Sequence, residues 1–200
     1  MLSDQWFVRT KPLAEPAIPG NAWDIYKQAW DVIGNLPGDE RDAIPELSGE
    51  EVAPDADKLD TICQKYRSHI DLLRQALQRT TVDPHYAYEQ GFAMEFPYVS
   101  KCLAASRFLA GMASHLHRQG RDDEALDLLV LNLGMSQDLA RQGPLMQSLV
   151  LIMCEGFVHA GCRELLANHK LTPRSLQEAL GMMEKMDAGR PQLRDALTAE

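Results

Sequence analysis

The sequence predicts an all-α protein of antiparallel helical hairpins that stack as a bundle or as a short right-handed superhelix. Apolar residues recur at intervals of three and four along most of the chain, which is the spacing of one face of an α-helix. No segment shows the alternation of apolar and polar residues that indicates a strand. Short turns join several of the predicted helices, so these neighbours are expected to run antiparallel.

The chain divides into an N-terminal arm and one helical domain. Residues 1–20 are rich in proline, which blocks helix and favours an extended path. Residues 21–200 form a single all-helical domain. Within it, an acidic loop is expected over 34–54, with one turn of helix after Ser48, and an aromatic-rich connection over 84–98. The sequence pattern predicts helix up to the last residues, which leaves open that the chain is a piece of a longer protein.

The predicted helices are bounded by capping residues, glycine and proline. Asn21 is a good N-cap for the first helix, and Pro173 suits a first helical turn. Gly120 and Gly143 each end a helix, and Pro144 opens the next. The predicted helices span residues 21–33, 55–79, 97–118, 122–142, 144–168 and 172–187, with a last one from 191.

The helix expected over 55–79 carries a narrow apolar stripe with heptad-like spacing. Such a stripe requires a partner helix. The stripe consists of Leu59, Cys63, Tyr66, Ile70, Leu73 and Leu77.

Composition narrows the classes of partner. Hydrophobic residues make up 45% of the 200 residues, and 20 Lys and Arg against 29 Asp and Glu give a net charge of −9. This charge repels phosphate backbones and anionic lipid surfaces. We therefore expect a protein or peptide partner and no nucleic acid, and the apolar helix faces also permit a homo-oligomer.

The sequence predicts no transmembrane segment. Its most apolar stretch, 144–162, contains Gln147, Glu155 and His159, and a charge at the bilayer centre costs roughly 2.5 kcal/mol or more. The N-terminus lacks the apolar core of a secretory signal. We expect a cytoplasmic protein, with a removed signal or membrane anchor as the alternative.

The four cysteines are expected to be free thiols. A chain of 200 residues can bury a sizeable core without disulfides, and no C-x-x-C motif is present. The cysteines are Cys63, Cys102, Cys154 and Cys162.

Residues 112–129, MASHLHRQGRDDEALDLL, resemble one helical hairpin of the tetratricopeptide-repeat family. The positions that match the family are Met112, Ala113, Leu116, Gly120, Ala125 and Leu129. Asn132 departs from it, because a small residue is expected there, and the pattern does not recur at the family's period of about 34 residues. The resemblance covers residues 104–133 and implies stacked hairpins with a concave face that binds a peptide or a protein.

Three residues of the helix expected over 144–168 form the first candidate site. On a wheel of about 100° per residue, Glu155, His159 and Cys162 share an arc of about 60°. If this arc faces a groove, Glu155 and His159 suit a general base and its orienting residue, or all three suit metal ligands. We favour the alternative, in which Glu155 and His159 are an i, i+4 pair on the polar edge of an amphipathic helix.

The opposite arc of this helix is expected to face the core. It is apolar, and Cys154 falls near it. The residues predicted to be buried are Val150, Met153, Phe157, Val158, Gly161 and Leu165.

The aromatic connection supplies a second candidate site. Tyr86, Tyr88 and Phe92 would line a pocket for an apolar ligand or partner, with Glu89 and Glu95 as its polar groups. The favoured alternative is that these aromatic residues fill the core between two hairpins.

Two other motifs carry no assigned chemistry. His115 and His117 are two residues apart and therefore point about 200° away from each other on a helix, which prevents both from binding one metal ion. The acidic residues around 39–60 lack the ordered spacing of a calcium loop, so a solvated loop is expected. We assign no catalytic residue, no metal ligand and no cofactor.

These observations predict a non-enzymatic helical module that binds a protein or peptide, or that serves in assembly. One alternative is a small metal-binding protein or enzyme with a site on the 148–166 helix. The other is an apolar small-molecule binder that uses the aromatic residues of 85–98.

Overall fold

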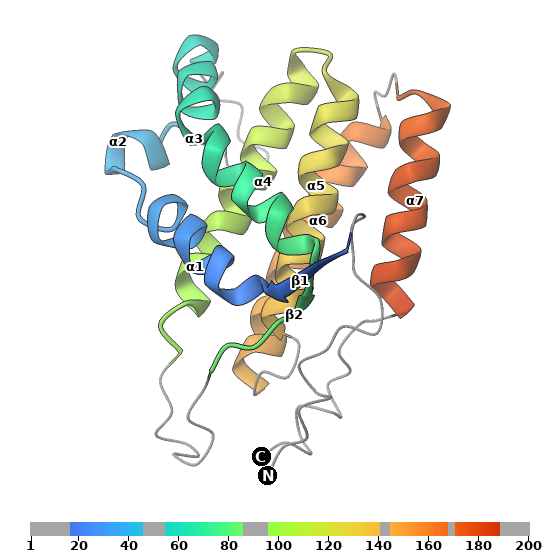
Figure 1. The fold of residues 1–200 in the computed structure, drawn as a ribbon. Coiled ribbons are helices and arrows are strands. Elements are labelled where there is room, and N and C mark those ends of the chain that lie inside the picture. The colour runs from blue at the N-terminus through green and yellow to red at the C-terminus, as the bar shows by residue number, and fades with distance from the viewer. Residues whose placement is uncertain (1–16, 46–54, 86–95, 141–144, 168–170, 189–200) are drawn as a thin grey trace.

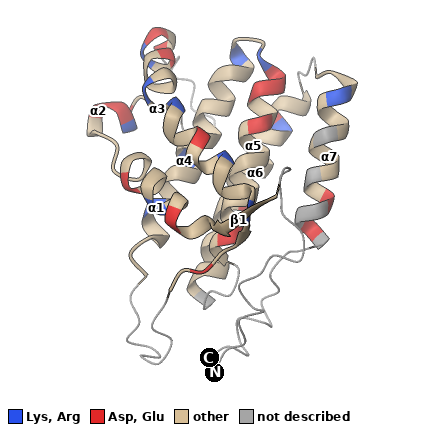
Figure 2. Cartoon of the chain, in the orientation of Figure 1, with Lys and Arg blue, Asp and Glu red and all other residues tan. Residues whose placement is uncertain are grey.

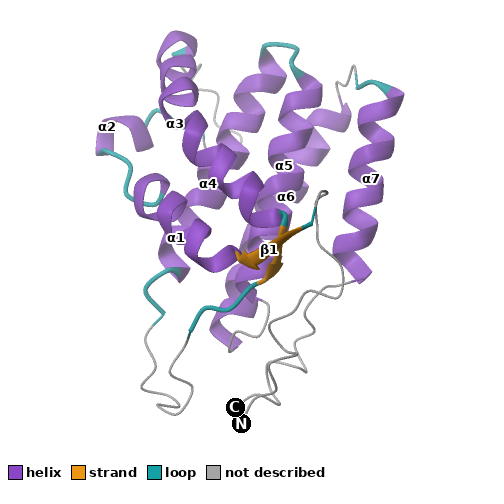
Figure 3. Ribbon diagram, viewed as in Figure 1, coloured by secondary structure: helices purple, strands orange, loops and turns teal. Residues whose placement is uncertain are grey.

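The computed structural model describes residues 17–45, 55–85, 96–140, 145–167 and 171–188. Within these residues the fold is helical apart from one short pair of strands (Figure 3), so the predicted all-α class is confirmed. The helices are α1 Ala22–Ile33, α2 Gly38–Arg41, α3 Ala56–Leu77, α4 Val99–Arg118, α5 Asp122–Ala140, α6 Leu145–Ala167 and α7 Pro173–Ala188.

The longer helices pack in two layers, which can be followed in Figure 1. In one layer α1 contacts α4, and α4 contacts α6. In the other layer α3 contacts α5, and α5 contacts α7. Across the layers α1 packs on α3, and α5 packs on both α4 and α6. The α4–α5 hairpin therefore lies at the centre of the molecule.

The aromatic face of α1 anchors this helix to α5. Trp23, Tyr26 and Trp30 are almost completely buried, and burial of such side chains stabilises a fold by roughly 1.5–3 kcal/mol each. Tyr26 donates a hydrogen bond of 2.6 Å to Asp138, and Trp30 Nε1 lies 3.2 Å from the sulfur of Met135. The predicted cap is confirmed, because the side chain of Asn21 accepts a hydrogen bond from the amide of Trp23.

A pair of parallel strands, β1 Ile18–Asn21 and β2 Arg79–Thr81, was not predicted. The strands have only four and three residues, too few for an alternating pattern to be visible in sequence. Asn21 also joins them to the following loop, because its side chain exchanges two hydrogen bonds with the backbone of Asp83, each 2.8 Å long. Residues 1–16 of the predicted arm lie outside the described residues.

The expected loop at 34–54 contains a turn of helix, α2, at a position where none was predicted. Glu40 attaches this turn to α3, because its carboxylate lies 2.6 Å from Lys65 Nζ and accepts a hydrogen bond of 2.6 Å from Tyr66. Those hydrogen bonds lower the pKa of Glu40 below its usual value. Glu40 therefore fastens the described part of the loop to the body, while Asp39 and Asp42 stay exposed, as expected of a solvated loop. The turn expected after Ser48 lies outside the described residues.

The two histidines of α4 bind different carboxylates. His115 Nε2 lies 2.8 Å from Asp60 Oδ1 on α3, and His117 Nδ1 lies 2.7 Å from Asp122 Oδ1 on α5. Hydrogen bonds from His115 and Gln119 lower the pKa of Asp60. The two rings therefore have partners on different helices, Asp60 on α3 and Asp122 on α5.

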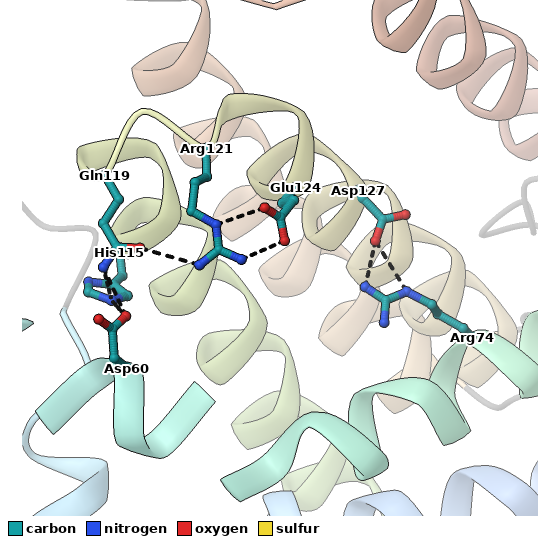
Figure 4. Close-up of polar contacts among 7 residues, drawn as sticks. All are labelled: Asp60, Arg74, His115, Gln119, Arg121, Glu124 and Asp127. Atoms are coloured by element: carbon teal, nitrogen blue, oxygen red, sulfur yellow. Dashed lines mark hydrogen bonds and ion pairs between the residues drawn. The ribbon is translucent and has the colours of Figure 1, made fainter. Parts of the chain in front are cut away.

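Figure 4 shows further charged contacts, which lie beside the contact of Asp60 with His115 and continue along α5. Arg121 lies 2.6 Å from Glu124 and thereby lowers the pKa of that carboxyl. Arg74 of α3 lies 2.6 Å from Asp127. Gly120 makes the sharp turn between α4 and α5 with φ of +74°, a conformation that glycine adopts without steric cost.

None of the described helices combines the length and apolarity needed to cross a membrane.

Candidate functional site

The three predicted residues of α6 differ in burial. Glu155 is buried with 8% of its surface exposed, His159 is exposed and Cys162 is half-buried. The core side of α6 contains Val150, Leu151, Cys154, Val158 and Leu165, together with Gln147, Ser148 and Glu155. Among the described residues, no group of three such side chains is placed to hold a metal ion, and the roles of Glu155 and His159 as general base and orienting residue stay a prediction.

The prediction of which α6 residues face the core was wrong in part. Val150, Val158, Gly161 and Leu165 are buried as expected. Met153 is exposed over 47% of its surface, although it was predicted to lie in the core, and Phe157 is only half-buried. The reason is that α6 is apolar on nearly all sides, so its sequence does not indicate which side other helices cover.

The second predicted site lies outside the described residues, because these do not include Tyr86, Tyr88 or Phe92. The described end of that connection belongs to the aromatic core. Tyr98 packs edge-on against Trp23 at a centroid distance of 6.1 Å.

A pocket of about 1170 Å³ lies on the α1–α4–α6 layer, and we call it the inter-helix pocket. Its walls come from the end of α1, the segment 41–45, α4 and α6. Its lining combines apolar and aromatic side chains with a few polar groups, a combination that binding sites also show. The large apolar residues that line it are Ile33, Leu36, Ile44, Phe108, Met153 and Phe157.

Glycines bring the walls of the inter-helix pocket close to one another. A Cβ atom on Gly111 would lie 2.3 Å from Ile44 Cγ2, and one on Gly34 would lie 2.7 Å from Lys101 Cβ. Both contacts are shorter than real Cβ atoms allow, so the segment 41–45 and the end of α1 reach α4 only because these positions have no side chain. Gly156 differs, because a Cβ there would meet nothing within 4 Å. This glycine on the pocket wall leaves the space open.

Two arginines reach the inter-helix pocket. Arg41 lies beside Asp42 at 3.7 Å, with both side chains at least 70% exposed, so this pair is weak but partly neutralises its charge. Arg107 is exposed, and its guanidinium lies over the ring of Phe157 at 5.6 Å from the centroid. Among the described residues, no carboxylate forms an ion pair with Arg107.

Next to α6 Met153, the surface continues as an apolar row. Its members are Met146, Leu149, Ile152 and Met153, each between 46% and 55% exposed. We call these four residues the α6 apolar row. An exposed row of this kind that runs into a pocket is typical of a binding surface.

The four cysteines are free, as predicted. Cys102 and Cys154 are both completely buried. A hydrogen bond from Cys102 lowers the pKa of Cys154 to about 7, against the opposing effect of burial. Burial raises the pKa of Cys102 well above its usual value. In the part of the chain that the structure describes, no group of three or more His, Cys, Asp or Glu is placed to hold a metal ion.

No family model, curated protein or solved structure matches this chain. The likeness of residues 104–133 to a tetratricopeptide-repeat hairpin therefore stays a prediction from sequence.

The inter-helix pocket was missed by reasoning from sequence. One signal for it was present: Gly156 interrupts an otherwise strongly apolar helix and stands one turn after Ile152. No pattern in the sequence indicated that the end of α1 and the segment 41–45 line this pocket, because those residues meet α6 only in the folded molecule.

Proposed function

We propose that this protein is a non-enzymatic binding module whose inter-helix pocket and α6 apolar row together receive an apolar segment of a protein partner. One observation carries the proposal: the two surfaces are continuous, since Met153 belongs to both. Burial of exposed apolar surface is the main favourable term in protein association, at roughly 25 cal/mol per Å².

The size of the surface favours a peptide or protein segment over a small molecule. Pockets for small ligands have volumes of roughly 300–1,000 Å³, and the inter-helix pocket of about 1170 Å³ is extended further by the apolar row. The alternative of an enzyme or metal site on α6 is weakened, because Glu155 faces the core while His159 faces outward.

The proposal is tested by filling the inter-helix pocket. Gly156→Trp places a large side chain in the open space, and Gly181→Trp on α7 is the matched control, because a Cβ there also meets nothing within 4 Å. The probe is a displayed library of helical peptides with apolar residues fixed at i, i+3, i+4 and i+7, selected on the wild-type protein.

We expect the selected peptides to bind Gly156→Trp about tenfold or more weakly, a loss of about 1.4 kcal/mol. Their affinity for Gly181→Trp should equal that for wild type, with circular dichroism confirming that both variants are folded. Peptides that bind all three proteins equally, or a library that yields no binder, would contradict the proposed function.

A further inference from the structure

We infer that the segment bound in the inter-helix pocket is an amphipathic helix of a partner protein that carries an acidic residue beside its apolar face, and that Arg107 receives its carboxylate. This inference rests on the proposed function and adds the chemistry of the partner. It is carried by the spacing of exposed residues on α6, by the charges of α4 and α6, and by the position of Arg107.

The spacing on α6 fits a helix as the bound segment. The exposed apolar positions Met146, Leu149 and Met153 continue into the pocket at Gly156 and Ala160, with steps of three and four residues. This stripe is about 21 Å long at 1.5 Å per residue. A helix of about four turns matches that length, and laying its apolar face into a groove between helices is a common mode of peptide recognition.

The charges on this layer run against those of the whole protein. The net charge of the chain is −9, yet α4 contains no Asp or Glu and carries Lys101, Arg107 and Arg118. Lys101 is paired with Asp31 of α1, which leaves Arg107 and Arg118 as the cations of α4 without an ion pair among the described residues. Both carboxylates of α6 are engaged with the body, because Glu155 is buried and Glu164 accepts hydrogen bonds of 3.1 Å from Ser114.

By contrast, α5 in the other layer begins with Asp122, Asp123 and Glu124, and red segments mark acidic residues on it in Figure 2. Asp122 and Glu124 are already paired with His117 and Arg121. The α4–α6 face, where Arg107 has no ion pair among the described residues, favours an acidic partner, because opposite charges steer association and like charges oppose it.

Arg107 has the geometry of an anion receiver. Its guanidinium lies over the ring of Phe157, a contact that holds the planar group in place at the edge of the pocket. The N–H groups in the guanidinium plane remain available for a carboxylate, which arginine binds through two parallel hydrogen bonds. Arg41 is less suited to this role, since Asp42 lies 3.7 Å away.

The test uses the same peptide library, with the positions beside the apolar residues randomised. We expect binders of the wild-type protein to be enriched in Asp and Glu over Lys and Arg. Replacement of that acid by Gln or Asn in the strongest binder should weaken binding by about tenfold, as expected for loss of a charged hydrogen bond. Arg107→Glu should reverse the preference, so that Lys and Arg are enriched.

Arg118→Glu is the matched control, because it makes the same charge change on the same helix at an exposed position outside the pocket lining. It should leave the acidic preference unchanged. If wild-type binders show no acidic preference, or if Arg107→Glu keeps it, the role of Arg107 is wrong while the pocket still binds apolar helices.

Failure of the proposed function has a different signature, namely that no selected peptide is sensitive to Gly156→Trp. The competing occupant is a second copy of this chain. Sedimentation velocity distinguishes it: a dimer that Gly156→Trp abolishes would overturn the inference of an acidic partner helix, and a monomer at the concentrations used for peptide binding supports it.

Discussion

At the scale of single residues, burial decides which polar and reactive groups are open to chemistry. Glu155 and Cys154 are adjacent in sequence, and both face the core. His159, one turn after Glu155, faces outward. The presence of a reactive residue type in the sequence therefore does not predict chemistry unless the exposure of its side chain is known. That exposure depends on the neighbouring helices.

The thiols give a prediction at this scale. A pKa of about 7 gives Cys154 a larger fraction of thiolate than an ordinary cysteine has, and the thiolate is the nucleophilic form, but the residue is 0% exposed. We expect a maleimide to modify the half-buried Cys63 and Cys162 first, and Cys154 and Cys102 only on the timescale of unfolding. Mass spectrometry of each cysteine after timed labelling measures this order.

Addition of low denaturant should speed the labelling of Cys154 and Cys102 selectively. Labelling of Cys154 in native protein as fast as that of Cys63 would show that reagents reach the core through an opening that the structure does not contain.

At the scale of elements, glycines determine how closely the helices and the segment 41–45 approach α4. The contact of Ile44 with Gly111 and that of Lys101 with Gly34 fix two walls of the inter-helix pocket. A third glycine, Gly161, lies where a Cβ would be 2.7 Å from Leu129 Cδ2, so α5 and α6 also approach closely. Gly156 alone among the α6 glycines faces open space.

This contrast predicts opposite effects of the same substitution. Gly111→Ala should destabilise the protein by about 1–3 kcal/mol, because Ile44 and the backbone of Pro45 must move. Gly156→Ala should stabilise it by up to about 1 kcal/mol through helix propensity alone. Urea unfolding followed by circular dichroism gives both free energies. Changes of the same sign in the two variants would show that the packing at Gly111 is wrongly described.

At the scale of the whole molecule, charged contacts fasten α3 to its neighbours. Glu40 joins α2 to α3, and Asp60 joins α3 to α4. Arg74 extends this set to α5 through Asp127. These contacts attach α2, α4 and α5 to α3 through charged side chains.

The contacts predict a loss of stability in acid. The folded state lowers the pKa of Glu40, Asp60 and Glu124 below their ordinary values of 4.5, 3.8 and 4.5. Their contribution is therefore complete above the unfolded-state values and is lost as the pH falls through the lower folded-state values. We expect the melting temperature to fall below about pH 4, as measured by circular dichroism between pH 7 and pH 3.

Asp60→Asn should make this pH dependence shallower, because one of the three shifted carboxyls is gone. Asp57→Asn, the same charge change on α3 without a contact to α4, is the control and should leave the slope as in wild type. Identical slopes for Asp60→Asn and wild type would mean that the contact of Asp60 with His115 contributes nothing to stability.

The sequence by itself determined the features that depend on residues near one another in the chain. The cap at Asn21, the turn at Gly120 and the apolar stripe of α3 were all predictable, because capping, glycine turns and helical periodicity act over a few residues. The helices they bound were predicted within a few residues of their ends.

Only the tertiary structure decided the orientation of α6, the strand pairing of 18–21 with 79–81, and the inter-helix pocket. An apolar pattern on nearly all sides of α6 is compatible with several orientations, and packing against α4 and α5 selects one of them. The pocket arises where Ile44 meets Gly111, residues that are far apart in the chain. Contacts between residues so far apart have no recognisable pattern in the local sequence. Which residues meet depends on the shape of surfaces that other helices form.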